Sequence, residues 1–107
     1  NRLQTPADYQ AVFNQPISSR SPYFTVLARP NNREYARLGM IVAKRLVKRA
    51  VHRNVIRRSI RESFRVNQEA LAGLDIVVLV RRALKSDVQP HIFYDCLKQQ
   101  WKELRNL

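Results

Sequence analysis

The side chains with the clearest chemistry are the Lys and Arg residues between Ala43 and Arg65. This stretch reads AKRLVKRAVHRNVIRRSIRESFR and carries nine of them against a single acid, Glu62. A helix turns once in about 3.6 residues, which sorts the later part of the stretch into two faces. The apolar face, expected to pack on a sheet, holds Val55, Ile56, Ser59, Ile60, Ser63 and Phe64. The opposite face is one contiguous polar arc with Arg53 at its margin: Asn54, Arg57, Arg58, Arg61, Glu62 and Arg65.

This arc differs from a helix face that merely contacts water. Such a face usually mixes charges at i and i+4, because opposite pairs stabilise a helix and like pairs destabilise it. Here Arg57, Arg61 and Arg65 follow one another at that spacing, and a guanidinium group binds phosphate through two parallel hydrogen bonds. Four residues at the entry to the helix, where backbone N–H groups also favour phosphate, extend the surface: Lys44, Arg45, Lys48 and Arg49. The pattern favours polyanion binding over a solvated face.

The sequence contains no recognisable catalytic group. His52 and His91 read as surface or core-edge side chains, and Cys96 reads as a small buried hydrophobe. His91 and Cys96 lack the second His or Cys pair that a zinc site needs. The eight acids form no cluster for two metals, and two glycines are too few for a phosphate-cradling loop. We therefore expect no catalytic residue and no metal site within this chain.

The net charge narrows the class of partner. The 107 residues carry 20 Lys and Arg against 8 Asp and Glu, a formal charge of +12, which makes nucleic acid the leading candidate partner. The apolar fraction of 45% is expected of one packed domain over 1–107. An anionic membrane is the second candidate, but the core already needs the helix's apolar face. No apolar run reaches the ~20 residues of a membrane span, and the opening shows no signal-peptide pattern. With one cysteine and so no internal disulfide, a cytoplasmic protein without membrane contact is expected.

The elements that must position the basic helix follow from local patterns. Thr5 as N-cap and Pro6 at the first helical position begin a short helix that ends near Asn14. Residues Tyr23–Arg29 and Arg37–Ala43 are rich in β-formers and read as strands. The short turn-like link between these two strands predicts that they pair as an antiparallel hairpin.

The second half of the chain continues this alternation. The basic helix is expected over Arg49–Gln68, with Gly73 after it. The run DIVVLVR (75–81) is too short for a stable helix, so it reads as a central strand covered on both faces. A loop through Ser86 and Asp87 leads to a last helix from Pro90, with an apolar stripe of Phe93, Leu97, Trp101 and Leu104. The fold class is α/β, an α+β sandwich of helices packed on a small sheet.

A spaced set of residues carries a family resemblance: Lys44-Arg45, Lys48, Arg49-Ala50-Val51, Arg53-Asn54, Ile56-Arg57-Arg58, Arg61-Glu62 and Phe64. This set resembles the signature of the protein subunit of bacterial ribonuclease P. The likeness extends to the opening NRL, to RLG at Arg37–Gly39 and to the aromatic pair of the first helix. One position departs, because the family usually has Arg-Asn-Arg where Val55 follows Asn54. On the helical wheel Val55 falls on the core-facing side.

The resemblance implies more than spacing can. It implies the order α-β-β(-β)-α-β-α, a small mixed sheet and a left-handed crossover between parallel strands, against the usual preference. Family members join one catalytic RNA and assist removal of the 5′ leader from precursor tRNA; the active site and its Mg²⁺ belong mainly to the RNA. The chain is then the accessory subunit of an endoribonuclease without an obligate protein partner. The RNA-binding residues implied are Lys44, Arg45, Lys48, Arg49, Arg53, Asn54, Arg57, Arg58, Arg61 and Arg65.

A cleft between the sheet and the first helix is implied as the site of the single-stranded leader. Single strands are held by aromatic platforms beside a basic surface, and Tyr9 and Phe13 share a helix face, although they could equally be that helix's core anchors. The cleft residues so implied are Tyr9, Phe13, Tyr23, Thr25 and Leu27, with Arg45 on leader phosphates. The alternative function, from a different class, is a structural rRNA-binding protein of the ribosome, which would share the charge and size.

Overall fold

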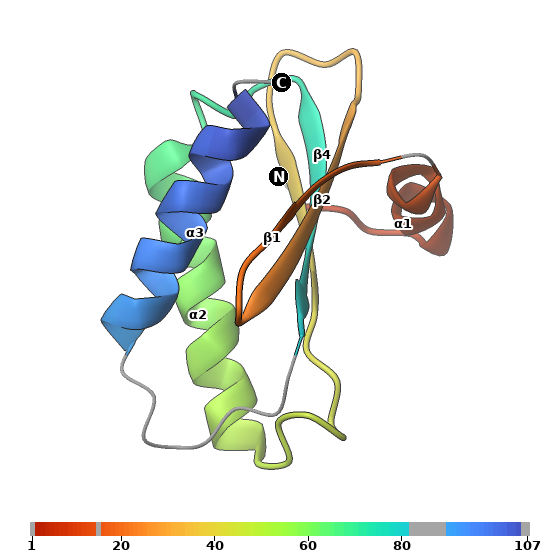
Figure 1. Ribbon diagram of the computed structural model, residues 1–107. Coiled ribbons are helices and arrows are strands. Elements are labelled where there is room, and N and C mark those ends of the chain that lie inside the picture. The colour runs from red at the N-terminus through yellow and green to blue at the C-terminus, as the bar shows by residue number, and fades with distance from the viewer. Residues whose placement is uncertain (1, 15, 82–89, 106–107) are drawn as a thin grey trace.

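The computed structural model describes residues 2–14, 16–81 and 90–105 (Figure 1). Its elements follow the order predicted above, with a short strand added before the first predicted one. The predicted loop through Ser86 and Asp87 lies outside the described residues. The helices and strands are α1 (Pro6–Phe13), β1 (Ile17–Arg20), β2 (Phe24–Pro30), β3 (Arg37–Ile41), α2 (Ala50–Asn67), β4 (Leu74–Val80) and α3 (Pro90–Arg105).

The four strands form one mixed sheet in the order β1-β2-β4-β3. β4 pairs antiparallel with β2 and parallel with β3, so that Val77 lies between Leu27 and Gly39. The predicted hairpin of β2 and β3 is therefore wrong, although β4 is central as predicted. β4 is buried on both faces, and a strand with two apolar faces is stabilised most at the centre of a sheet. The connection β3–α2–β4 is the crossover, and its left hand stays a prediction.

The sheet separates two hydrophobic clusters. Helices α2 and α3 cover one face and α1 covers the other (Figure 1). Phe24, Val26 and Ala28 of β2 belong to the larger cluster under α2 and α3. Leu27 alternates to the opposite face, where it packs with Val12 of α1 in the smaller cluster.

Polar contacts inside the larger layer fix α3 on its neighbours. The Trp101 indole donates a hydrogen bond of 2.9 Å to the Ser63 hydroxyl on α2, which explains why a serine lies on the buried face. The Gln100 amide donates to the carbonyl oxygens of Ser19 and Phe24 at 3.0 and 3.2 Å. The predicted α3 stripe is confirmed, since all four of its members are buried. α2 therefore rests on a firmly packed layer.

Candidate nucleic-acid interface

The two faces of α2 are separated by burial as predicted, with one exception. Ile56, Ser59, Ile60, Ser63 and Phe64 are buried, and Asn54, Arg58, Arg61 and Arg65 are exposed. Val55 was predicted to face the core but is 38% exposed. It lies about 100° around the helix from Ile56, at the edge of the buried arc. The position where the family usually has arginine therefore faces outward.

The arginines of this face divide into paired and unpaired groups. Arg65 donates to Glu62 one turn earlier, and these hydrogen bonds lower the pKa of the carboxyl and raise that of the guanidinium. Among the described residues, the guanidinium groups of Arg57, Arg58 and Arg61 have no hydrogen-bond or ion-pair partner. Three uncompensated charges within little more than one helical turn form a surface that attracts phosphate groups.

A basic corner joins β3 to α2. β3 ends at Ile41, earlier than predicted, so that Lys44 and Arg45 lie exposed in a turn and Lys48 and Arg49 lie exposed just before the helix. Val47, in the middle of this corner, is buried and packs in the larger hydrophobic cluster, which fixes the corner on the core.

Arg53 has a structural part in this corner. Its guanidinium donates to the carbonyl oxygens of Val47 and Lys48, both at 3.0 Å. Arg49 is the N-cap of α2, and its side chain makes no capping hydrogen bond. The first N–H groups of the helix therefore point into a region rich in positive charge, an arrangement that favours an anion.

The aromatic residues of α1 occupy different environments. Tyr9 packs over Gly39 of β3 so closely that a Cβ there would lie 2.7 Å from two of its ring carbons. Phe13 is 38% exposed, whereas its neighbour Val12 is fully buried. Val12 is thus the core anchor of α1. Phe13 is left available to a ligand, and Tyr9 combines a structural contact with partial exposure.

Polar anchors hold α1 on the sheet. A capping box of Thr5 and Asp8 begins the helix, and Arg29 donates to the carbonyl oxygens of Ala11 and Asn14 near its end. Arg37 pairs with Asp75 through two hydrogen bonds of 2.8 and 2.6 Å and lies 3.6 Å from Asp8.

The carboxyl groups of this network are charged in the folded state. Backbone hydrogen bonds from Gln4 and Thr5 lower the pKa of Asp8. Burial acts to raise the pKa of Asp75, but the hydrogen bonds from Arg37 and Asn31 outweigh it and hold that pKa below its usual value.

Of the predicted cleft residues on the sheet, Thr25 and Leu27 are half-buried on the strand that carries α1. Tyr23 does not share their face. It lies at the bend before β2, and its ring meets Phe93 of α3 edge-on with centroids 5.8 Å apart. Residues two apart, such as Tyr23, Thr25 and Leu27, share a face only while the chain is in a strand. β2 begins at Phe24, so Tyr23 lies just outside this alternation. The structure therefore packs Tyr9 and Leu27 on the same small cluster, places Thr25 on the strand face that Leu27 shares, and leaves Tyr23 on the other layer. Phe13 lies on α1 and is not part of that cluster.

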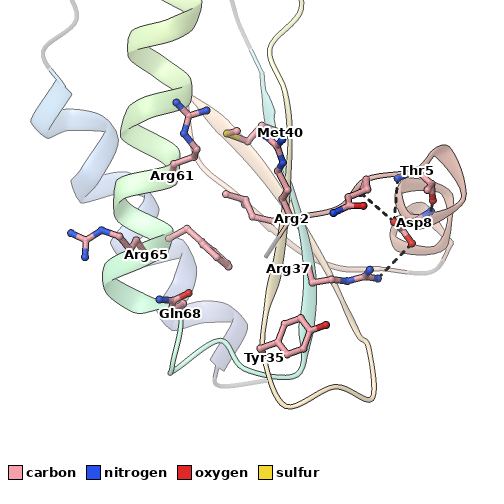
Figure 2. Close-up of a pocket in the computed structure, with 12 residues that line it drawn as sticks. Arg2, Thr5, Asp8, Tyr35, Arg37, Met40, Arg61, Arg65 and Gln68 are labelled. Atoms are coloured by element: carbon pink, nitrogen blue, oxygen red, sulfur yellow. Dashed lines mark hydrogen bonds and ion pairs between the residues drawn. The ribbon is translucent and has the colours of Figure 1, made fainter.

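Sequence reasoning missed two residues that lie beside the basic face. Arg2 and Tyr35 line a pocket of about 590 Å³ together with Arg61, between α2, β3 and the N-terminal segment (Figure 2). Arg2 reaches it because it forms a parallel bridge to Leu38 on β3. In the sequence, the available signal was an aromatic residue, Tyr35, next to a turn. That signal does not indicate which helix or strand the Tyr35 side chain faces.

Among the described residues, no three His, Cys, Asp or Glu side chains meet in a way that could hold a metal ion. Burial raises the pKa of the Cys96 thiol, so the reactive thiolate is disfavoured there. The described part of the chain also has no helix long and apolar enough to span a membrane.

The described residues form a small α+β domain with a basic helix, α2, on one face of a mixed sheet and a short helix, α1, packed on the other. The family model described as Ribonuclease P matches residues 1–105, and the chain belongs to this family. It is the protein component of ribonuclease P, the ribozyme that processes the 5′ end of tRNA.

Solved structures agree with this assignment. The RNase P protein of Staphylococcus aureus is 32% identical, with 96% of this chain and 94% of that chain covered and a TM-score of 0.86. A mutant of the S. aureus protein, described as having defective mRNA degradation activity, is also 32% identical, with 97% and 87% covered and a TM-score of 0.87. The RNase P protein of Thermotoga maritima is 31% identical, with 95% and 96% covered and a TM-score of 0.80.

Proposed function

We propose that this protein binds the catalytic RNA of ribonuclease P through the basic face of α2 and the corner before it, and binds the 5′ leader of precursor tRNA beside α1. The observation that carries the proposal is the row of guanidinium groups on Arg57, Arg58 and Arg61, which have no hydrogen-bond or ion-pair partner among the residues that the structure describes. Phosphate contacts of this kind supply most of the affinity of such complexes and make it depend on salt.

The leader site is supported by the exposure of Phe13 and the partial exposure of Tyr9. Bases of a single strand stack on such rings without regard to sequence. Arg45, exposed in the turn after β3, supplies a cation for the leader's phosphates. The rings would hold the bases and the arginine the backbone of the same strand.

The protein's contribution is to position two RNAs and to reduce their repulsion. The described residues include no group of three His, Cys, Asp or Glu side chains that could hold a metal ion, and we expect the Mg²⁺ of the reaction on the RNA subunit. Positive charge on this surface has its largest effect when few other cations are present, because dissolved ions screen the same repulsion.

A single-turnover cleavage assay tests this function. The cognate catalytic RNA is mixed with precursor tRNA at several Mg²⁺ concentrations, with and without protein. The protein should restore accurate 5′ processing at low Mg²⁺ and become partly dispensable at high Mg²⁺. Cleavage by rigorously RNA-free protein, or no stimulation at any Mg²⁺ concentration, would contradict the proposal.

Two controls sharpen this assay. Replacing His52, His91 or Cys96 with Ala should leave the chemical step unchanged, because no proton transfer is assigned to them. Recovering the RNA bound to the protein from cells distinguishes the proposal from a structural ribosomal protein. The first predicts one catalytic RNA, and the second predicts ribosomal particles.

A further inference from the structure

The pocket between α2 and β3 has the size and lining of a ligand site outside the surfaces assigned above. Its volume of about 590 Å³ lies within the ~300–1,000 Å³ typical of small-molecule sites. Its lining comes from the segment around Arg2, the start of α1, Tyr35 in the turn before β3, the edge strand β3 itself, and the second half of α2 (Figure 2). It joins the basic face at Arg61, which belongs to both.

The positive charge in this pocket is not cancelled. Within the described part of the chain, the guanidinium groups of Arg2 and Arg61 have no hydrogen-bond or ion-pair partner. Arg37 is engaged by Asp75 and Asp8. Arg65 is engaged by Glu62 and, in Figure 2, turns away from β3. Two cations therefore remain for a ligand, and the one lining carboxylate, Asp8, is already paired.

The remaining lining suits an aromatic base. Phe64 and Leu38 are buried and Met40 is half-buried, which gives the pocket an apolar wall. Tyr35 is 41% exposed at the end where Gln68 also lies (Figure 2). Arg33 lies over the Tyr35 ring at 5.8 Å and donates to its hydroxyl at 3.0 Å, which holds the ring in place. A held, exposed ring beside amide groups can stack a base and hydrogen-bond its edge.

These features identify one ligand chemistry. An inorganic anion would use the arginines but would leave the apolar wall and Tyr35 without a contact. An added β-strand is disfavoured because Arg2 and Leu3 already occupy the edge of β3, through the bridge to Leu38 and a hydrogen bond of 3.0 Å. We infer that this pocket binds one unpaired nucleotide of RNA, with its phosphate on Arg2 and Arg61 and its base against Tyr35. The inference rests on the proposed function, which brings an RNA strand to Arg61.

The test measures two affinities of matched variants. Tyr35→Ala removes the platform, Tyr35→Phe keeps it, Arg2→Ala removes a phosphate contact, and Arg20→Ala removes an exposed arginine from β1, at the opposite edge of the sheet. Each variant is titrated with catalytic RNA. The reconstituted complex is then titrated with precursor tRNA and mature tRNA. Thermal unfolding of each variant shows that its fold is kept.

We expect Tyr35→Ala to weaken one of these affinities by about 5- to 150-fold, the usual effect of losing one stacked base. Arg2→Ala should weaken the same affinity and lower its salt dependence by about one phosphate contact. Arg20→Ala should bind like the wild type. Tyr35→Phe should stay much closer to the wild type than Tyr35→Ala does, because it loses the hydrogen bond from Arg33 but keeps the ring and its cation–π contact. Loss in the first titration means that the catalytic RNA supplies the nucleotide, and loss for precursor tRNA alone means that the leader supplies it.

Other outcomes overturn the inference. If Tyr35→Ala binds like Tyr35→Phe in both titrations, no base stacks there, whatever Arg2→Ala does. If Arg2→Ala equals Arg20→Ala, no phosphate lies on Arg2. Failure of the proposed function looks different, because the wild-type protein would then neither bind nor stimulate the catalytic RNA.

Discussion

Helices α2 and α1 cover opposite faces of the sheet and are held there in different ways. α2 buries five side chains and presents to the outside arginines that have no partner within the described ranges 2–14, 16–81 and 90–105. α1 buries Val12 alone and is held by polar contacts at both ends. The comparison indicates a division of labour. Under the proposed function, α2 would serve as a fixed surface for phosphate groups, whereas α1 would present its rings to a strand of variable sequence.

The largest expected effect concerns stability. Ile60→Ala on α2 should lower the free energy of unfolding by ~2–5 kcal/mol, because a fully buried side chain leaves a cavity in the main core. Val12→Ala on α1 should cost less, since it removes fewer carbons and a smaller cluster surrounds it. Urea unfolding measures both values. Val66→Ala, at an exposed position of α2, is the control and should be near neutral. Equal losses for Ile60 and Val12 would remove the distinction between the two helices.

The next effect concerns the leader. Phe13→Ala should weaken binding of leader-bearing precursor tRNA by ~1–3 kcal/mol, through loss of a stacking platform, and leave mature tRNA unaffected. Tyr9→Ala should show the same selectivity but also lower stability, because the Tyr9 ring covers Gly39. Affinities of the reconstituted complex for the two RNAs measure this. If both RNAs weaken equally while the fold is intact, these rings do not contact the leader.

A smaller effect is expected for each arginine of α2. Arg57→Ala, Arg58→Ala and Arg61→Ala should each weaken RNA binding and reduce the slope of log affinity against log salt by ~0.9, the value of one phosphate contact. Arg53→Ala should differ, because it also lowers stability by releasing the carbonyl oxygens of Val47 and Lys48. Unchanged slopes in the first three variants would make this a merely solvated face.

The smallest expected effect is on the free energy of unfolding at low pH. The pKa of Asp75 is lower in the folded protein than the ~3.9 of a free side chain. Its charge therefore stabilises the fold fully above that value, and this contribution is lost as the pH falls through the folded pKa. The free energy of unfolding between pH 5 and pH 2 should fall less steeply in Asp75→Asn than in the wild type. Parallel curves would mean that the pair with Arg37 does not stabilise the link between sheet and α1.

Most of the fold could be predicted from the sequence because local patterns determine it. The period of α2, the stripe of α3, the Thr5 capping box and the doubly apolar run of β4 each depend on neighbours in the chain. The errors occur where a prediction from neighbouring residues was overridden by pairing with a strand that is distant in the sequence. A short link predicted a β2–β3 hairpin, but β4 pairs with both strands and separates them.

The candidate site shows the same difference between what local sequence patterns predict and what contacts between distant elements decide. The sequence by itself predicted a polyanionic partner, and it identified Arg58, Arg61 and Arg65 as exposed residues of α2, since charge and helical period require no other element. Only the tertiary structure decided that Val55 is exposed, that Tyr23 packs on Phe93 and that Arg53 holds the corner. It also placed Arg2 and Tyr35 beside Arg61, residues far apart in the chain. Such contacts depend on which strand lies next to which, and that order is set by burial across the whole sheet.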